Sequence, residues 1–242
     1  MKRAVFSLGI ISAVAITGCN PFNFNRIAGS GQITTTNYPL AGFECVEAGS
    51  SFDVYIQPGE KFAVTVTTDS NLIEDLSVTQ DGKWLRLGTR SAVNISPTKL
   101  VANITMPSLT DISASGATHF DLGSFKMDNF EVRASGASRI DGDIHAQRGY
   151  LDCSGASEVT LSGEILSLTL KGSGASRLNC SKLMASKTDV DLSGASNADV
   201  NAREQMDYDL SGASDLNYAG NPRIGQSQCS GASNASRKGA TF

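Results

Sequence analysis

Residues 151–161 read LDCSGASEVTL, and the Ser-Gly-Ala-Ser unit at their centre decides the fold. The unit occurs seven times, once ending in threonine, and successive copies start 20, 19, 19, 20, 18 and 19 residues apart. So short and regular a period is typical of a solenoid in which each repeat forms one turn. The copies start at Ser115, Ser135, Ser154, Ser173, Ser193, Ser211 and Ser230.

The residues around each copy alternate in character. Small or apolar residues recur three places and one place before the first serine and five places after it, with polar residues between them. This period of two predicts short strands on both sides of the unit, and the run at 165–170 predicts a third strand in each turn. The glycine supplies the positive φ of a tight corner.

We therefore predict an all-β fold, a right-handed parallel β-helix (solenoid) of about seven turns with an N-terminal β cap. Helical repeats are the main alternative architecture, but their periods exceed about 30 residues. Leucine-rich repeats share the short period, but their leucine and asparagine pattern is not found here.

Charged residues also recur at fixed places in the repeat. Stacked turns would place each residue about 4.8 Å from its counterpart, so charges of opposite sign would alternate along two columns. One column contains Arg139, Glu158 and Arg177, and the other contains Arg133, Asp152, Lys171 and Asp191.

The N-terminus is typical of an exported bacterial lipoprotein. Lys2 and Arg3 precede an apolar run, which ends in Ile16-Thr17-Gly18-Cys19, similar to a lipobox. Cys19 is the predicted lipid-attachment residue, and acyl chains on it would bind the membrane. Asn20, rather than aspartate, follows it and indicates the outer membrane. The alternative is an ordinary secretory signal with a chance cysteine.

Five segments follow from these patterns. They are a signal peptide (1–18), a tether (19–28), an N-terminal β cap (29–109), the repeat β-helix (110–236) and a C-terminal tail (237–242). Within the cap, residues 51–56, 63–67 and 84–87 are predicted strands, and 71–76 is a predicted helical turn. The polar residues 234–238 indicate a cap or a frayed end.

Composition narrows the range of partners. The chain has 242 residues, of which 40% are hydrophobic and 18% charged, as in a globular protein. Removal of residues 1–18 leaves 18 basic and 24 acidic residues, a net charge of −6, which disfavours nucleic acid and anionic lipid as partners. The predicted partners are a membrane, through the lipid anchor, and an envelope protein or glycan.

Four cysteines follow Cys19, without the close spacing of a metal site. They are Cys45, Cys153, Cys180 and Cys229. Cys153 and Cys229 occupy the same place four repeats apart, about 19 Å at the usual strand spacing, which is beyond disulfide reach. We predict a buried thiol at both.

Catalytic and metal-binding patterns are weak. His119 and His145 occupy different places in adjacent repeats, and no Gly-x-Ser-x-Gly elbow accompanies them. Asp121 and Asp141 would stack and could form a weak calcium site, although a solvated acidic ridge explains them better. We predict neither an enzyme nor a cofactor, because catalytic sites usually interrupt a repeat.

A family resemblance covers residues 29–233. The chain resembles the putative auto-transporter adhesin, head GIN domain family, once catalogued as a domain of unknown function. The resemblance implies a β-helical fold, a cell-envelope setting and often a lipoprotein signal, and it carries over no catalytic or ligand-binding residue. The matching motifs are 29–31, Phe43, 52–56, 69–72, 81–82, 106–109 and the Ser-Gly-Ala repeats.

The first functional hypothesis is a non-enzymatic adhesion or envelope-interaction module. The seven first serines, Ser115 to Ser230, would form its candidate interaction ridge, although serine and glycine are also what a tight corner tolerates. An envelope scaffold or sensor component that binds a protein, and a carbohydrate-active β-helix enzyme, are the alternatives.

Overall fold

The computed structural model describes residues 26–90 and 93–238, and within them it contains eighteen strands and one 3-10 helix. The sheet continues along the whole described chain, apart from a small pair formed by β1 and β8. The elements are β1 (Arg26–Ala28), β2 (Ile33–Tyr38), β3 (Cys45–Ala48), β4 (Asp53–Pro58), β5 (Ala63–Asp69), η1 (Ser70–Asp75), β6 (Leu76–Asp81), β7 (Trp84–Thr89), β8 (Asn94–Ser96), β9 (Leu100–Met106), β10 (Asp111–Ala114), β11 (His119–Ala134), β12 (Arg139–Cys153), β13 (Glu158–Gly172), β14 (Arg177–Leu192), β15 (Asn197–Leu210), β16 (Asp215–Ala219), β17 (Arg223–Cys229) and β18 (Asn234–Arg237).

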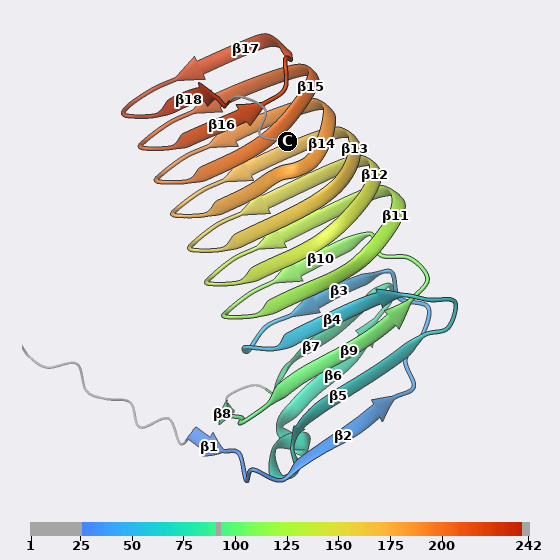
Figure 1. Cartoon of the computed structure of the whole chain (residues 1–242). Helices are drawn as coiled ribbons and strands as arrows, with labels where there is room; N and C mark the ends of the chain where they lie inside the picture. Colours follow the sequence, from blue (N-terminus) through green and yellow to red (C-terminus); the bar gives the residue numbers. More distant parts are fainter. Residues whose placement is uncertain (1–25, 91–92, 239–242) are drawn as a thin grey trace, which may run out of the picture.

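The repeat region is a β-solenoid, as the sequence predicts, and the molecule has about seven turns (Figure 1). Strands β10 to β18 stack in parallel, each turn on the one before. The prediction of three short strands per turn is wrong for the central turns. There a single strand of 14 to 16 residues bends back on itself, and the hydrogen-bond ladder continues around the bend with small register shifts.

The inward columns form the core. Phe120 pairs with Ile140, Ile140 with Val159, and Val159 with Leu178, and all four side chains are buried. The predicted charge columns also stack in register. Arg139 lies 3.2 Å from Glu158, whereas Arg133 contacts Glu131 and Asp111 rather than Asp152.

Parallel stacking extends into the N-terminal half of the chain. Strands β3 and β4 pair with β10 and β11, and β7 and β9 pair with β3 and β4. The turn built by β3 and β4 therefore lies between two turns that follow it in the chain. Its corner lacks the repeated unit, and Ser50 and Ser51 adopt positive φ values of 57° and 65°.

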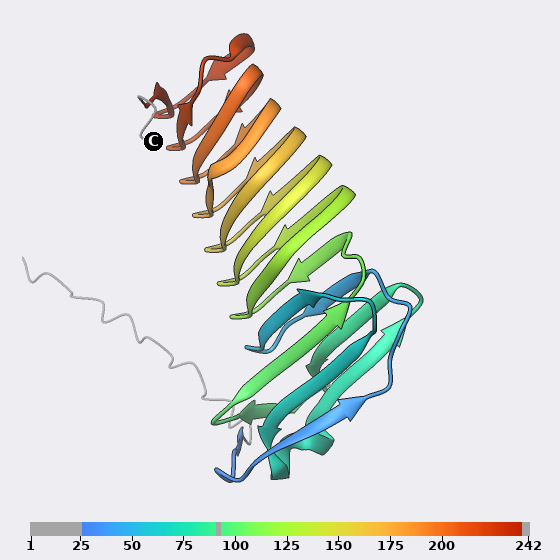
Figure 2. The ribbon, with the colours of Figure 1, turned by 45° about the vertical axis from the view of Figure 1, so that its right-hand side comes forward.

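Antiparallel strands close the N-terminal end of the stack (Figure 2). Strand β5 lies between β9 and β2 and is antiparallel to both. Strand β6 is antiparallel to β7. Helix η1, close to the predicted helical turn, connects β5 to β6 and buries Leu72 completely. These elements cover the core beneath the first turn.

A buried carboxylate joins three segments at this end. Asp69 accepts hydrogen bonds from the Gly31 amide at 2.7 Å and from the amide and hydroxyl of Thr98, both at 2.8 Å. Burial alone would raise the pKa of Asp69, but these hydrogen bonds and one from the Lys99 amide hold it below its usual value.

Both ends of the described chain form strands where the sequence predicted a tether at one end and a cap or frayed end at the other. Strand β1, at the end of the predicted tether, pairs in parallel with β8. At the other end of the chain β18 pairs with β16, and Lys238 lies 2.8 Å from Asp199. Residues 234–237, for which a frayed end was one possibility, thus form an ordered strand.

The four cysteines after Cys19 are free thiols. Cys45, Cys153 and Cys180 are buried, and desolvation by burial raises the pKa of Cys153 to about 12. The prediction of a buried thiol is confirmed for Cys153 and wrong for Cys229. Cys229 is exposed because its strand, β17, pairs with β15 on one side and with no other strand among the described residues.

Candidate functional site

The Ser-Gly-Ala-Ser units form one tight corner of the solenoid, and their backbone stacks closely. Gly155 has a φ of 71°, and a Cβ atom added to it would lie 2.7 Å from the carbonyl oxygen of Gly136. The amide of Ala156 donates a hydrogen bond of 2.7 Å to the same oxygen. Positive φ and contact with the preceding turn therefore both require glycine here.

The hydroxyls of the unit are directed mainly at the backbone. The last residue of each internal copy is buried, and Ser196, for example, donates to the carbonyl of Ser193 at 2.7 Å. The first serine of the internal copies is half-buried, and Ser135 lies 3.4 Å from the Ala114 carbonyl of the preceding turn.

The predicted ridge, Ser115 to Ser230, is therefore a continuous corner whose hydroxyls mostly serve the fold. Only the end copies, Ser115 and Ser230, have an exposed first serine, and between them the ridge presents glycine backbone and alanine methyl groups to solvent. The ligand role of these serines stays a prediction. Cys19, the predicted lipid-attachment residue, lies outside the described residues.

The opposite side of each turn, where the long strand bends, absorbs the differences in repeat length. All register shifts between the turns of the repeat fall on this side, at Leu122/Ser124, Thr160/Ser162, Cys180/Met184, Ala185/Lys187 and Met206/Tyr208. Bulges of this kind redirect side chains and are frequent beside functional sites. The corner is uniform, and the bend is where the turns differ from one another.

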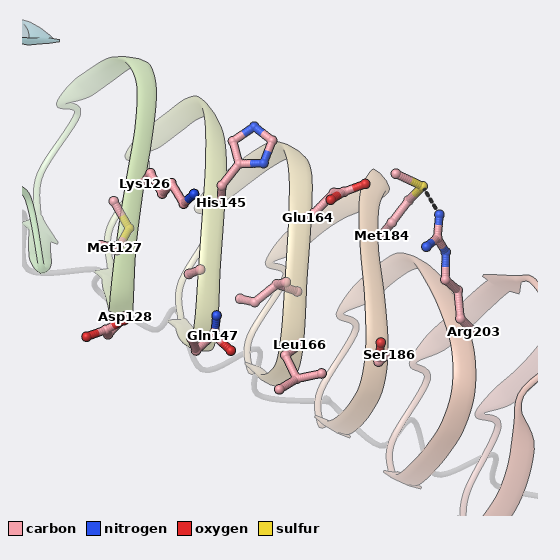
Figure 3. A pocket seen from close by; sticks show the side chains of 12 residues that line it. Lys126, Met127, Asp128, His145, Gln147, Glu164, Leu166, Met184, Ser186 and Arg203 are labelled. Carbon is pink, nitrogen blue, oxygen red and sulfur yellow. Dashed lines mark hydrogen bonds between the residues drawn. The ribbon is translucent and has the colours of Figure 1, made fainter.

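An open groove of about 710 Å³ runs along this bend (Figure 3). Lys126, His145 and Glu164, from successive turns, lie along one edge, and Leu166 stands on the other with 52% of its surface exposed. The full lining is Lys126, Met127, Asp128, His145, Ala146, Gln147, Glu164, Ile165, Leu166, Met184, Ser186 and Arg203.

The groove offers charges of both signs beside apolar surface. Within the described chain, Lys126, Asp128 and Glu164 take part in no ion pair, and Arg203 contacts only the sulfur of Met184 among the groove residues. His145 lies 3.5 Å from Asp143, which is not part of the groove lining. Charged side chains that form no ion pair, next to an exposed leucine, can contact a partner without breaking interactions of the fold.

One residue of the predicted acidic pair, Asp141, interacts with neighbouring side chains of the fold. Asp121 and Asp141 do stack in register, but Asp141 accepts a hydrogen bond of 2.8 Å from Arg139 and lies 3.1 Å from His119. Among the residues described, no group of three or more His, Cys, Asp or Glu side chains is placed to hold a metal ion.

Sequence reasoning missed the groove. Its residues occupy places in the repeat that share no residue type from turn to turn, so no pattern marks them. The usable signal was the change in period between 18 and 20 residues, which had to be accommodated somewhere other than the constant corner.

A β-solenoid with a closed N-terminal end is the class of protein that this architecture defines. A model of the family described as "putative auto-transporter adhesin, head GIN domain" matches residues 42–222. The chain belongs to this family, as its motifs predicted. No curated protein matches it.

Solved structures share the fold at low sequence identity. A putative adhesin from Bacteroides fragilis is 22% identical with a TM-score of 0.80, and the match covers 88% of this chain and 100% of that one. A putative lipid binding protein from Parabacteroides distasonis is 16% identical, with a TM-score of 0.72 and coverages of 88% and 99%. A putative adhesin from Parabacteroides merdae is 13% identical, with a TM-score of 0.70 and the same coverages.

Within the described residues, no helix has the length and apolar character needed to cross a membrane.

Proposed function

We propose that the protein is a lipid-anchored, non-enzymatic adhesion module of the bacterial envelope, and that it contacts its partner through the groove on the bend. The observation that carries this proposal is that the corner and the bend of each turn have different structural roles. Corner atoms are committed to stacking, whereas the bend collects the length changes, the uncommitted charges and the exposed Leu166. Variable segments on a rigid scaffold commonly carry binding function.

The dimensions of the groove favour an extended partner. Its lining comes from five successive turns, so it spans about 19 Å along the stack at the usual strand spacing. Lys126 and Arg203 supply positive charge near its two ends, and Glu164 supplies negative charge between them. A polymer with regularly spaced polar groups, such as an envelope glycan or an extended protein segment, fits this arrangement.

The family and its relatives support the envelope setting. The family description and two of the similar structures name adhesins, and a third structure is named a lipid binding protein. The lipobox-like residues 16–19 supply the anchor in this proposal, and Asn20 directs the anchored chain to the outer membrane.

The groove is tested by Leu166→Glu, with Ala156→Glu as the matched control on the exposed corner. The readout is retention of lipid-free protein on isolated envelopes. We expect Leu166→Glu to weaken binding about tenfold or more, equivalent to about 1.4 kcal/mol, and Ala156→Glu to bind like the parent. Equal binding of all three proteins would refute the groove, and selective loss by Ala156→Glu would assign the contact to the ridge.

Pretreatment of the envelopes identifies the partner. Protease treatment should abolish retention if the groove holds an envelope protein, and periodate oxidation should abolish it if the groove holds a glycan. Release of reducing ends from the envelope during incubation would contradict the non-enzymatic assignment.

The anchor is tested separately by Cys19→Ser. We expect the parent chain to incorporate labelled palmitate and to partition into detergent, and the variant to do neither. Protease added to intact cells then reports whether the anchored domain faces outward, as adhesion requires. A protected domain would favour a periplasmic scaffold instead.

A further inference from the structure

Strand β2 is an edge strand of the large sheet. It pairs with β5 on one side, and within the described residues no strand pairs with its other side (Figures 1 and 2). Its sequence is ITTTNY, rich in the β-branched and aromatic residues that favour strands. Ile33, at its start, is 46% exposed.

The free side of β2 presents a defined set of backbone groups. The Ser70 amide donates to the Gln32 carbonyl, and Gln32 precedes Ile33 in the register with β5. Because hydrogen-bonded and non-hydrogen-bonded positions alternate in an antiparallel pair, the N–H and C=O groups of Ile33, Thr35 and Asn37 point away from β5. The contact of the Thr35 and Thr67 hydroxyls at 2.8 Å fits a non-hydrogen-bonded pair.

Each of the other edge strands of this sheet contains a charged residue, whereas β2 contains none. Strand β6 contains Asp81, β17 contains Arg223 and β18 contains Arg237, whereas β2 has no charged residue and no proline. Charges and prolines on edge strands are the usual protection against pairing with another chain. Strand β2 is the edge without that protection.

We propose that β2 pairs with β2 of a second copy of the chain, antiparallel and around a two-fold axis at Thr35. In this register Thr35 lies opposite Thr35 of the partner subunit, and Ile33 lies opposite Asn37 of the partner subunit. All three outward-facing residues of each copy then form hydrogen-bonded pairs. A register centred on Thr36 would instead place Ile33 opposite a proline, Pro39, which has no N–H to donate.

A second copy fits this edge better than an arbitrary charged strand. Two-fold pairing places each residue beside a residue of the same strand, so any charge near the axis would face its like. An uncharged strand avoids that repulsion, and threonine pairs across strands are favourable. A contact of one short strand is small, so the dimer is weak and concentration-dependent.

Sedimentation of residues 19–242 carrying Cys19→Ser, which excludes both the acyl chains and the apolar signal peptide as causes of association, tests the proposal. We expect a reversible monomer–dimer equilibrium that Thr35→Lys weakens at least about tenfold. Thr79→Lys, on the exposed surface of edge strand β6, is the matched control and should leave the equilibrium unchanged. A parent chain that stays monomeric at its solubility limit, or equal weakening by both variants, overturns the proposal.

Cross-linking tests the register even where lysine would disturb folding. In a Cys19→Ser, Cys229→Ser background, Thr35→Cys should oxidise to a disulfide-linked dimer, because opposite residues of a hydrogen-bonded pair are about 5.5 Å apart between Cα atoms. Oxidation forms one S–S bond from two thiols; two electrons pass to added copper(II) phenanthroline, one to each of two complexes, and two protons are released to the buffer. Thr79→Cys should stay monomeric, and cross-linking at equal rates would refute the pairing. Envelope binding through the groove is measured independently, so either proposal can fail alone.

Discussion

Glycine in the corner meets two separate requirements. The backbone of Gly155 is left-handed, and the carbonyl of Gly136 leaves no room for a side chain. Gly42 shares the first property, with a φ of 81°, but a Cβ added to it would meet nothing within 4 Å. The two positions therefore separate the cost of the conformation from the cost of stacking.

Gly155→Ala should destabilise the fold by more than Gly42→Ala. The conformational cost common to both is about 1–2 kcal/mol, and the difference between the variants measures the clash with the preceding turn. Urea denaturation followed by circular dichroism gives both values. Equal losses would mean that the stacked corners yield easily to an added methyl group.

The buried serines that end each unit are not equivalent. Ser196 donates to the Ser193 carbonyl and accepts from the Ser176 hydroxyl at 3.3 Å, whereas the Ser138 hydroxyl has no hydrogen-bond partner among the described residues. Ser196→Ala should cost about 1 kcal/mol, and Ser138→Ala should be neutral or stabilising because it removes an unsatisfied polar group. A larger loss for Ser138→Ala in denaturation experiments would show that its hydroxyl is satisfied in solution.

Asp69 should make the N-terminal end sensitive to acid. Its pKa is lowered in the folded chain, so the stability it contributes is present above its unfolded pKa of about 4 and is lost as the pH falls through the folded value. The parent should therefore lose more thermal stability between neutral and acidic pH than Asp69→Asn, which should melt several degrees lower at neutral pH. Parallel melting curves for the two proteins across pH would contradict this role.

At the scale of elements, corner and bend should differ in tolerance. Corners stay in register over the whole repeat, whereas the bend already absorbs register shifts of one to three residues between turns. Insertion of Gly-Ser after Gln147, in the bend, should leave a folded protein with a slightly lower Tm. The same insertion after Gly155 should prevent folding or lower the Tm far more, and the opposite order would contradict the division between the two sides.

Regular elements were predictable and irregular ones were not. The inward columns, the outward charge columns and the corner glycines follow from repetition, because stacked turns give equivalent residues equivalent surroundings. The turn formed by β3 and β4 lacks the repeated unit, and only tertiary pairing places it between later parts of the chain. The continuous strand through the bend also escaped prediction, because glycine lies there in some turns, as Gly123 and Gly163, but β14 and β15 have none, so no residue repeats at the bend to mark it.

The groove shows the same limit for the candidate site. Leu166 and Glu164 belong to one turn, and Lys126 and Arg203 come from turns before and after it. Their proximity depends on the register between turns rather than on spacing along the chain. A serine ridge was visible in the sequence because it repeats, and a groove whose lining differs in every turn was not.

For the whole molecule, the two ends of the stack are protected unequally. Antiparallel strands and η1 close the N-terminal end, whereas β17 and β18 expose most of their residues. Hydrogen exchange should therefore be slowest in β12 to β14 and fastest in β17 and β18, as expected when each turn is stabilised by its neighbours. Uniform protection, measured by mass spectrometry, would instead indicate a single cooperative unit.

The constant corner also makes the molecule extensible. Strand β1 lies at the closed end and the final turn at the far end (Figure 1), so each turn adds about 4.8 Å between the start of the domain and its tip. Duplication of one repeat in the gene would bring its own glycine and its own columns, and the turns on either side would receive it without compensating change. The number of repeats then sets the length of the domain, which can change in steps of one turn without any redesign of the fold.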